Sequence, residues 1–95
     1  MRDYELVSII SPEIDEEGIS KIVERVGKSI SDRGGTVSET SRWGRRKLAY
    51  PFKKFMEGNY ILTRFKLEPK LVKEVSAEIK ASEEILRHLV AKIGD

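Results

Sequence analysis

The sequence predicts an α+β fold in which four strands alternate with two helices. Four stretches are rich in β-branched and aromatic residues, and two others place apolar residues at helical spacing. The chain has 95 residues, of which 39% are hydrophobic and 36% charged. This length is enough for one hydrophobic core, so we expect a single domain over residues 1–95.

The first half of the chain predicts a strand, a helix and a long second strand. Residues 4–10 form the first strand, which Ser11-Pro12 stops. The acidic residues 15–17 suit the positive end of a helix dipole, and Gly34-Gly35 ends that helix. Its apolar residues fall on one face: Ile19, Ile22, Val23, Val26 and Ile30. The second strand covers residues 36–53 and bends at Gly44.

The second half predicts a turn near residues 56–59, a strand, a helix and a last strand. The third strand covers residues 60–67 and turns four side chains to one side: Ile61, Thr63, Phe65 and Leu67. Pro69 suits the first position of the second helix, whose apolar face contains Leu71 or Val72, then Val75 and Ile79. Residues 85–93 form the fourth strand.

The element order is therefore β-α-β-β-α-β. Right-handed crossovers place both helices on one face of a four-stranded antiparallel sheet, which is the ferredoxin-like arrangement. This fold alone does not identify a function, because many unrelated activities use it.

The face of the sheet without helices also carries apolar residues. Tyr60 and Leu62 lie opposite the core side of the third strand, and Leu89 belongs to an apolar fourth strand. Scattered apolar residues are ordinary on protein surfaces. A contiguous apolar patch on an uncovered sheet instead suggests a protein partner, and we expect these three residues to lie near that contact.

The surplus positive charge is concentrated in residues 42–54. The formal net charge is +2. The first 41 residues carry nine acids and five bases, and the last 41 carry seven of each. The thirteen residues between them hold six bases and no acid: Arg42, Arg45, Arg46, Lys47, Lys53 and Lys54. Such a segment can neutralise phosphates, so it predicts nucleic-acid binding rather than only a solvated strand.

Aromatic residues lie among these bases, and Trp43 is the largest of them. Its indole could stack on an unpaired base, anchor a protein contact or cover the edge of the core. An RNA-recognition module shares the element order and stacks bases on its open sheet. Tyr4 and Tyr60 fit that mode, but residues 54–62 lack its Gly-aromatic-Gly-aromatic pattern.

The composition excludes several kinds of chemistry. There is no cysteine, which excludes disulfides and thiolate metal sites, and His88 is the only histidine. For His88 we favour a packing role over an RNA contact. No phosphate-binding glycine loop or nucleophile-elbow serine is present. We therefore expect no enzymatic activity, no cofactor and no metal. The absence of a secretory pattern or a long apolar run predicts a cytoplasmic protein without a membrane segment.

Three stretches carry a resemblance to a known family. Residues 43–51, Trp-Gly-Arg-Arg-Lys-Leu-Ala-Tyr-Pro, resemble a characteristic stretch of bacterial ribosomal protein S-six, the sixth protein of the small subunit. The opening residues 1–5 look like that family's start, and residues 86–90 are similar to its last strand. The match in length and element order spans essentially the whole chain. Many members carry a further C-terminal tail, whereas this sequence ends at Gly94-Asp95.

The resemblance implies a non-enzymatic role at the ribosome. It implies binding to 16S ribosomal RNA in the central domain, or platform, of the 30S subunit, together with ribosomal protein S-eighteen. Matched position by position, the positively charged residues of the family fall on Arg2, Arg45, Arg46 and Arg87. Lys47 lies within the motif. Lys53 and Lys54 are predicted RNA contacts more because of their charge than because of the resemblance. The alternative is a ferredoxin-like regulatory or interaction domain that binds a protein or a small ligand.

Overall fold

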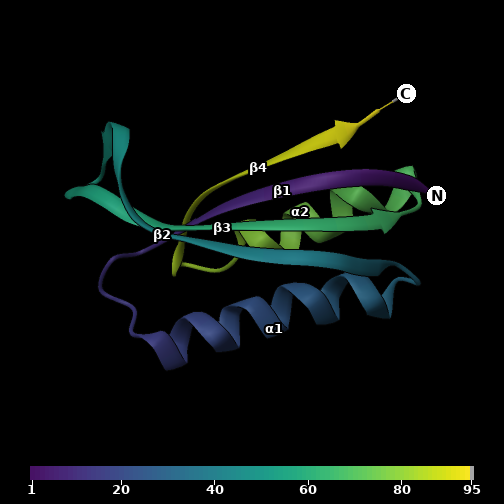
Figure 1. The fold of residues 1–95 in the computed structure, drawn as a ribbon, viewed down its shortest axis with the longest axis horizontal. Coiled ribbons are helices and arrows are strands. Elements are labelled where there is room, and N and C mark those ends of the chain that lie inside the picture. The colour runs from purple at the N-terminus through teal and green to yellow at the C-terminus, as the bar shows by residue number, and fades with distance from the viewer. Residues whose placement is uncertain (95) are drawn as a thin grey trace.

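The computed structural model describes residues 1–94 and contains one four-stranded sheet with two helices (Figure 1). The elements are β1 (Arg2–Ile10), α1 (Glu16–Asp32), β2 (Thr36–Phe52), β3 (Phe55–Leu67), α2 (Val72–Lys80) and β4 (Ile85–Ile93). The strand order is β2-β3-β1-β4, and every neighbouring pair is antiparallel. Helix α1 packs near β2, α2 packs near β4, and the helices contact each other. The predicted ferredoxin-like arrangement is confirmed.

The hydrophobic core lies between the helices and one face of the sheet. In β3, the residues predicted to share one side are all buried: Ile61, Thr63, Phe65 and Leu67. Phe65 is the largest fully buried side chain and stacks on Tyr4 of β1, with ring centroids 5.5 Å apart. Val75 and Ile79 complete the core from α2. This confirms the alternation predicted for β3 and the apolar face predicted for α2.

The ends of α1 follow the sequence signals closely. The Asp15 carboxylate caps the helix by accepting a hydrogen bond from the Gly18 N–H at 2.8 Å. Gly34 has φ +83°, a left-handed conformation that glycine adopts without strain. Gly35 is needed for space instead, because a Cβ atom there would lie 2.6 Å from the Lys66 carbonyl oxygen.

We expect Gly35→Ala to lower the free energy of unfolding by about 1–3 kcal/mol, because the clash is with backbone and no rotamer relieves it. The matched control is Gly27→Ala within α1, where a Cβ atom would meet nothing within 4 Å. That variant should gain about 0.5–1 kcal/mol, since alanine favours helix interiors over glycine. Urea unfolding of both variants measures the difference, and equal stabilities would contradict the proposed reason for Gly35.

The structure corrects three predicted boundaries. The turn between β2 and β3 lies at Lys53 and Lys54 rather than at residues 56–59, with Lys53 at φ +55°. Gly58 is a strand residue whose Cβ atom would lie 2.5 Å from Ile9, so it permits close packing and makes no turn. Residues 69–71 form a 3₁₀ turn, and α2 begins only at residue 72. Strand β1 begins two residues earlier than predicted, at Arg2.

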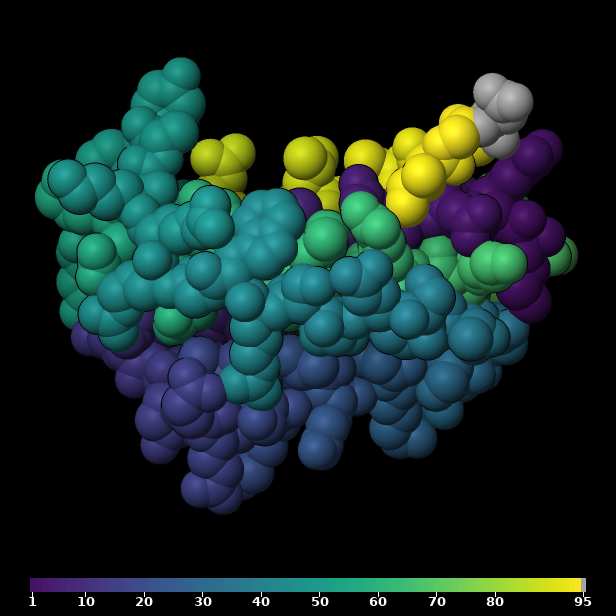
Figure 2. All heavy atoms as spheres, in the orientation of Figure 1, coloured from purple at the N-terminus to yellow at the C-terminus, as the bar shows by residue number. Residues whose placement is uncertain are grey.

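The hairpin of β2 and β3 extends beyond the rest of the sheet. The last pair between β1 and β3 joins Ile10 and Asn59, and past it β2 and β3 pair only with each other. We call residues 46–58 the arm. The arm rises from one end of the sheet on the side away from α1 (Figure 1). The surface is hollowed between the arm and the end of β4 (Figure 2).

Candidate nucleic-acid interface

Most of the predicted basic segment lies on the arm. Arg46, Lys47, Lys53 and Lys54 are exposed, and none of them belongs to the ion pairs found within residues 1–94. At the tip, the Lys53 and Lys54 ammonium groups each lie 5.7 Å from the ring centroid of the adjacent phenylalanine, Phe52 or Phe55. The arm therefore presents four positive charges that no carboxylate of the described chain neutralises.

Arg42 is held by the body of the protein. It pairs across the sheet with Ile61, whose side chain faces the helices, so its guanidinium reaches α1. There it contacts the Glu16 carboxylate at 2.6 Å and donates to the Ser20 hydroxyl at 2.7 Å. Fewer of its N–H groups are left for a ligand.

Arg45 is also bound internally. Its guanidinium donates to Glu57 at 3.1 Å and to the Pro12 carbonyl at 2.8 Å. These bonds fix the base of the arm to the loop before α1. The sequence grouped Arg45 with the other bases because cross-strand and loop partners are not visible in a charge count.

Trp43 lies on the open face of the sheet, at the base of the arm. It stacks on Tyr60 with ring centroids 6.4 Å apart and planes 9° from parallel. The Arg46 guanidinium lies 5.4 Å from the Trp43 ring. Gly44, at φ +82°, accompanies the register shift beside this stack. Trp43 is 42% exposed, so it is available to a ligand and does not close the core edge.

The open face continues as an apolar row across three strands. Leu62, Val7 and Leu89 are cross-strand neighbours on β3, β1 and β4. Leu62 is only 8% exposed, although it lies outside the main core cluster, whereas Leu89 is 66% exposed. Tyr60 lies in the next row. The three residues predicted to meet a partner thus share this face, with Leu89 the most accessible.

An ion-pair row borders the apolar row on the side away from the arm. The Arg64 guanidinium contacts Glu5 at 2.9 Å and Glu39 at 3.4 Å, joining the outer strand β2 to β1 through β3. The open face is therefore divided into an aromatic and basic end, an apolar centre and an ion-paired end.

The remaining predicted arginines occupy opposite ends of the sheet. Arg87 is exposed on β4 and pairs with Ile9, which also pairs with Tyr60, so it lies at the same end as the arm. Arg2 pairs with Leu67 at the other end. The structure therefore brings Arg87 toward the aromatic stack but does not bring Arg2 there.

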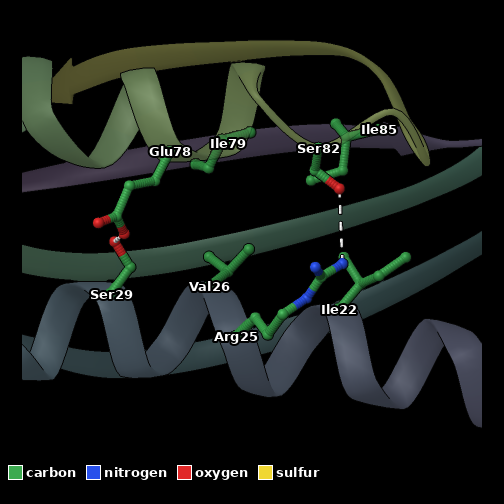
Figure 3. Close-up of a pocket in the computed structure, with 8 residues that line it drawn as sticks. All are labelled: Ile22, Arg25, Val26, Ser29, Glu78, Ile79, Ser82 and Ile85. Carbon is green, nitrogen blue, oxygen red and sulfur yellow. Dashed lines mark hydrogen bonds between the residues drawn. The ribbon is translucent and has the colours of Figure 1, made fainter.

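A cavity of about 130 Å³ lies between α1 and α2, on the far side of the sheet from the apolar row (Figure 3). Its rim groups are already bonded: Ser29 donates to Glu78 at 2.5 Å, and Arg25 donates to Ser82 at 3.5 Å. Hydrogen bonds from Arg33 and then Ser29 lower the pKa of Glu78. These bonds join the two helices, and none of the predicted RNA-binding residues lines the cavity.

His88 faces the helix layer. Its Nε2 atom lies 2.6 Å from the Ser76 hydroxyl of α2, and its ring is partly buried. Burial, followed by the positive charge of Lys80, lowers the pKa of the imidazole below its ordinary value of 6.5. This contact fits the packing role favoured from the sequence.

The lowered pKa of His88 predicts a loss of stability on acidification. The unfolded chain takes up the proton near pH 6.5, before the folded chain does, so stability is full above that pH and falls below it. The loss continues down to the folded pKa. Glu78 and Glu84, whose folded pKa values are lowered, begin to lose their contributions only near 4.5.

Denaturant unfolding at pH 7.5 and at about pH 5.5 tests this expectation. The His88→Gln variant, which keeps a hydrogen-bonding group beside Ser76, should lose less stability between the two values than the parent chain. An equal loss in both proteins would remove His88 as the cause.

Residues 1–94 contain no helix that is long and apolar enough to cross a membrane. Within the same residues, no group of three histidine, cysteine or acidic side chains is arranged to hold a metal ion.

Comparisons with known proteins agree with the fold. The family model described as ribosomal protein S6 matches residues 3–92. Small ribosomal subunit protein bS6 of Desulforamulus reducens is 36% identical over 95 residues, covering all of both chains. The same protein of Exiguobacterium sibiricum is 41% identical over 92 residues, covering 97% of each chain. The crystal structure of 30S ribosomal protein S6 from Thermotoga maritima has a TM-score of 0.90 and 36% identity, and the match covers 96% of this chain and 86% of that one.

The fold and these relatives define a protein of the small ribosomal subunit, which is part of the cytoplasmic ribosome. The chain belongs to the ribosomal protein S6 family. The resemblance carried by residues 43–51 is thereby confirmed.

Proposed function

We propose that this protein binds 16S ribosomal RNA in the platform of the 30S subunit, together with ribosomal protein S-eighteen, and catalyses no reaction. The observation that carries the proposal is the arm, with four positive charges outside any ion pair found in residues 1–94, beside the stack of the exposed Trp43 on the partly buried Tyr60. The charges suit phosphates, and the aromatic pair suits an unpaired base.

The partner protein is assigned to the apolar row of Leu62, Val7 and Leu89. The charged backbone of RNA does not bury an exposed aliphatic side chain favourably, whereas the apolar surface of a second protein does. Division of the open face into an aromatic, basic end and an apolar centre fits simultaneous binding of RNA and protein. A net charge of only +2 implies that the chain alone binds RNA weakly.

The absence of catalysis is proposed from the polar groups that line the described cavity. They are bonded to one another and leave no nucleophile beside a free base. The proposal that the protein catalyses no reaction would be overturned by reproducible turnover of a phosphate ester, if a point mutation in this chain abolished that turnover.

Filter binding with 16S platform fragments, with and without purified S-eighteen, tests the main proposal. We expect weak retention of RNA by either protein alone and strong retention by the pair. Equal retention of an unrelated RNA of the same length would contradict it. A ferredoxin-like domain that serves only protein contacts would bind S-eighteen and retain no RNA.

A further inference from the structure

A second positively charged surface lies along the opposite edge of the sheet, between α2 and β4. Lys73 and Lys80 lie on the same flank of α2 as Ser76, three residues after Lys73 and four before Lys80. Ser76 contacts His88 of β4, so this flank faces the edge strand. On β4, Lys92 pairs with the buried Tyr4 and shares the helix side of the strand.

The acids of α2 do not neutralise these lysines. Glu74 and Glu78 point the other way, where Arg33 of α1 contacts them at 3.3 and 2.8 Å. In the turn before β4, Glu84 is held by Arg25 at 2.8 Å. In the same turn, the exposed Glu83 belongs to no ion pair found in residues 1–94. All three lysines are exposed, and none belongs to an ion pair found in residues 1–94.

We infer that this edge, which we call the lysine edge and define as Lys73, Lys80 and Lys92, binds the phosphate backbone of a second, double-helical segment of the RNA. The inference rests on the proposed RNA-binding function. The two surfaces differ in chemistry: the arm combines bases with aromatic rings, whereas the lysine edge has flexible ammonium groups and no exposed aromatic ring. Stacking groups suit unpaired bases, and point charges without them suit the backbone of a duplex.

The position of the lysine edge supports contact with a separate segment. It borders β4, whereas the arm grows from β2 and β3, and β1 lies between β4 and β3. Figure 1 shows the arm and the end of β4, the strand that carries Lys92, at different ends of the molecule. A protein that holds an unpaired region at one edge and a duplex at the other would fix the angle between them.

Tethered hydroxyl-radical cleavage tests the inference, and the absence of cysteine makes the labelling clean. An iron chelate is attached to Lys80→Cys, to Lys47→Cys on the arm, or to Lys21→Cys on α1, and each protein is assembled with S-eighteen and the platform RNA. We expect the Lys80 probe to cut a duplex that the Lys47 probe does not cut. The Lys21 probe is the control, because Lys21 is exposed outside both proposed surfaces and beside Glu17.

The salt dependence of binding gives a second readout. Changing all three lysines of the edge to alanine should reduce the slope of log K against log salt by about 2.1–2.7, at roughly 0.7–0.9 per phosphate contact. One outcome is that the probe at position 80 cuts no more than the probe at position 21 while the probe at position 47 still cuts. In that case the lysine edge is not an RNA contact, and the proposed function stands. If no probe cuts, the proposed function fails as well.

The competing role of the lysines is protection of an exposed edge strand. In that case the triple variant would self-associate in light scattering, and its salt slope would equal that of the parent protein. That result would overturn the inference.

Discussion

The arm variant Arg46→Ala/Lys47→Ala/Lys53→Ala/Lys54→Ala should bind platform RNA with a salt slope about 3 units shallower than that of the parent protein. Each phosphate contact contributes roughly 0.7–0.9 to the slope, and none of these four side chains is engaged by a carboxylate of the described chain. Binding near physiological salt should fall by more than tenfold. Filter binding between about 50 and 200 mM salt, with S-eighteen present, measures both quantities.

Two comparisons make this result specific to the arm. Lys21→Ala/Lys28→Ala removes two exposed lysines of α1, which face Glu17 and Asp32, and should leave the slope unchanged. Arg45→Ala should change the slope less than Arg46→Ala, because Arg45 is bound to Glu57 and the Pro12 carbonyl. From the sequence alone, Arg45 and Arg46 are expected to contribute equally to RNA binding. An unchanged slope in the fourfold variant would show that the arm does not meet phosphates.

The fold could be predicted from the sequence because its signals are local. Three of these signals depend only on neighbours along the chain: the alternation in β3, the acidic residues at the start of α1 and the Gly34-Gly35 pair that ends it. The predicted position of the turn between β2 and β3 is wrong, because a glycine such as Gly58 is typical of turns in sequence. A glycine is needed at position 58 because a Cβ atom there would clash with Ile9. Ile9 is nearly fifty residues away in the chain, so no local sequence pattern reveals this contact.

The candidate site was predictable in composition but not in arrangement. The charge count found every base of residues 42–54, yet it could not separate Arg42, bound to Glu16, from the unpaired Lys47. The stack of Trp43 on Tyr60 depends on strand register and on the bulge at Gly44. The three lysines of the lysine edge are 7 and 12 residues apart in sequence and become neighbours only because α2 packs beside β4.

Leu89→Asp should prevent pairing with S-eighteen while leaving the protein folded. Leu89 is 66% exposed in the free chain, so a carboxylate there stays hydrated until a partner covers it. An unpaired charge buried in an interface costs several kcal/mol, enough to weaken pairing by at least a hundredfold. Titration calorimetry with purified S-eighteen measures the pairing, and a thermal melt of the free variant should match that of the parent.

Leu62→Asp is the matched variant that separates pairing from folding. Its side chain lies on the same apolar row but is only 8% exposed, so the aspartate would be buried even without a partner. We therefore expect a lower melting temperature together with impaired pairing. The alternation in β3 places Leu62 on the open face, but alternation identifies only the face of the sheet and not how deeply neighbours cover a residue. Normal pairing by Leu89→Asp would exclude the apolar row as the S-eighteen contact.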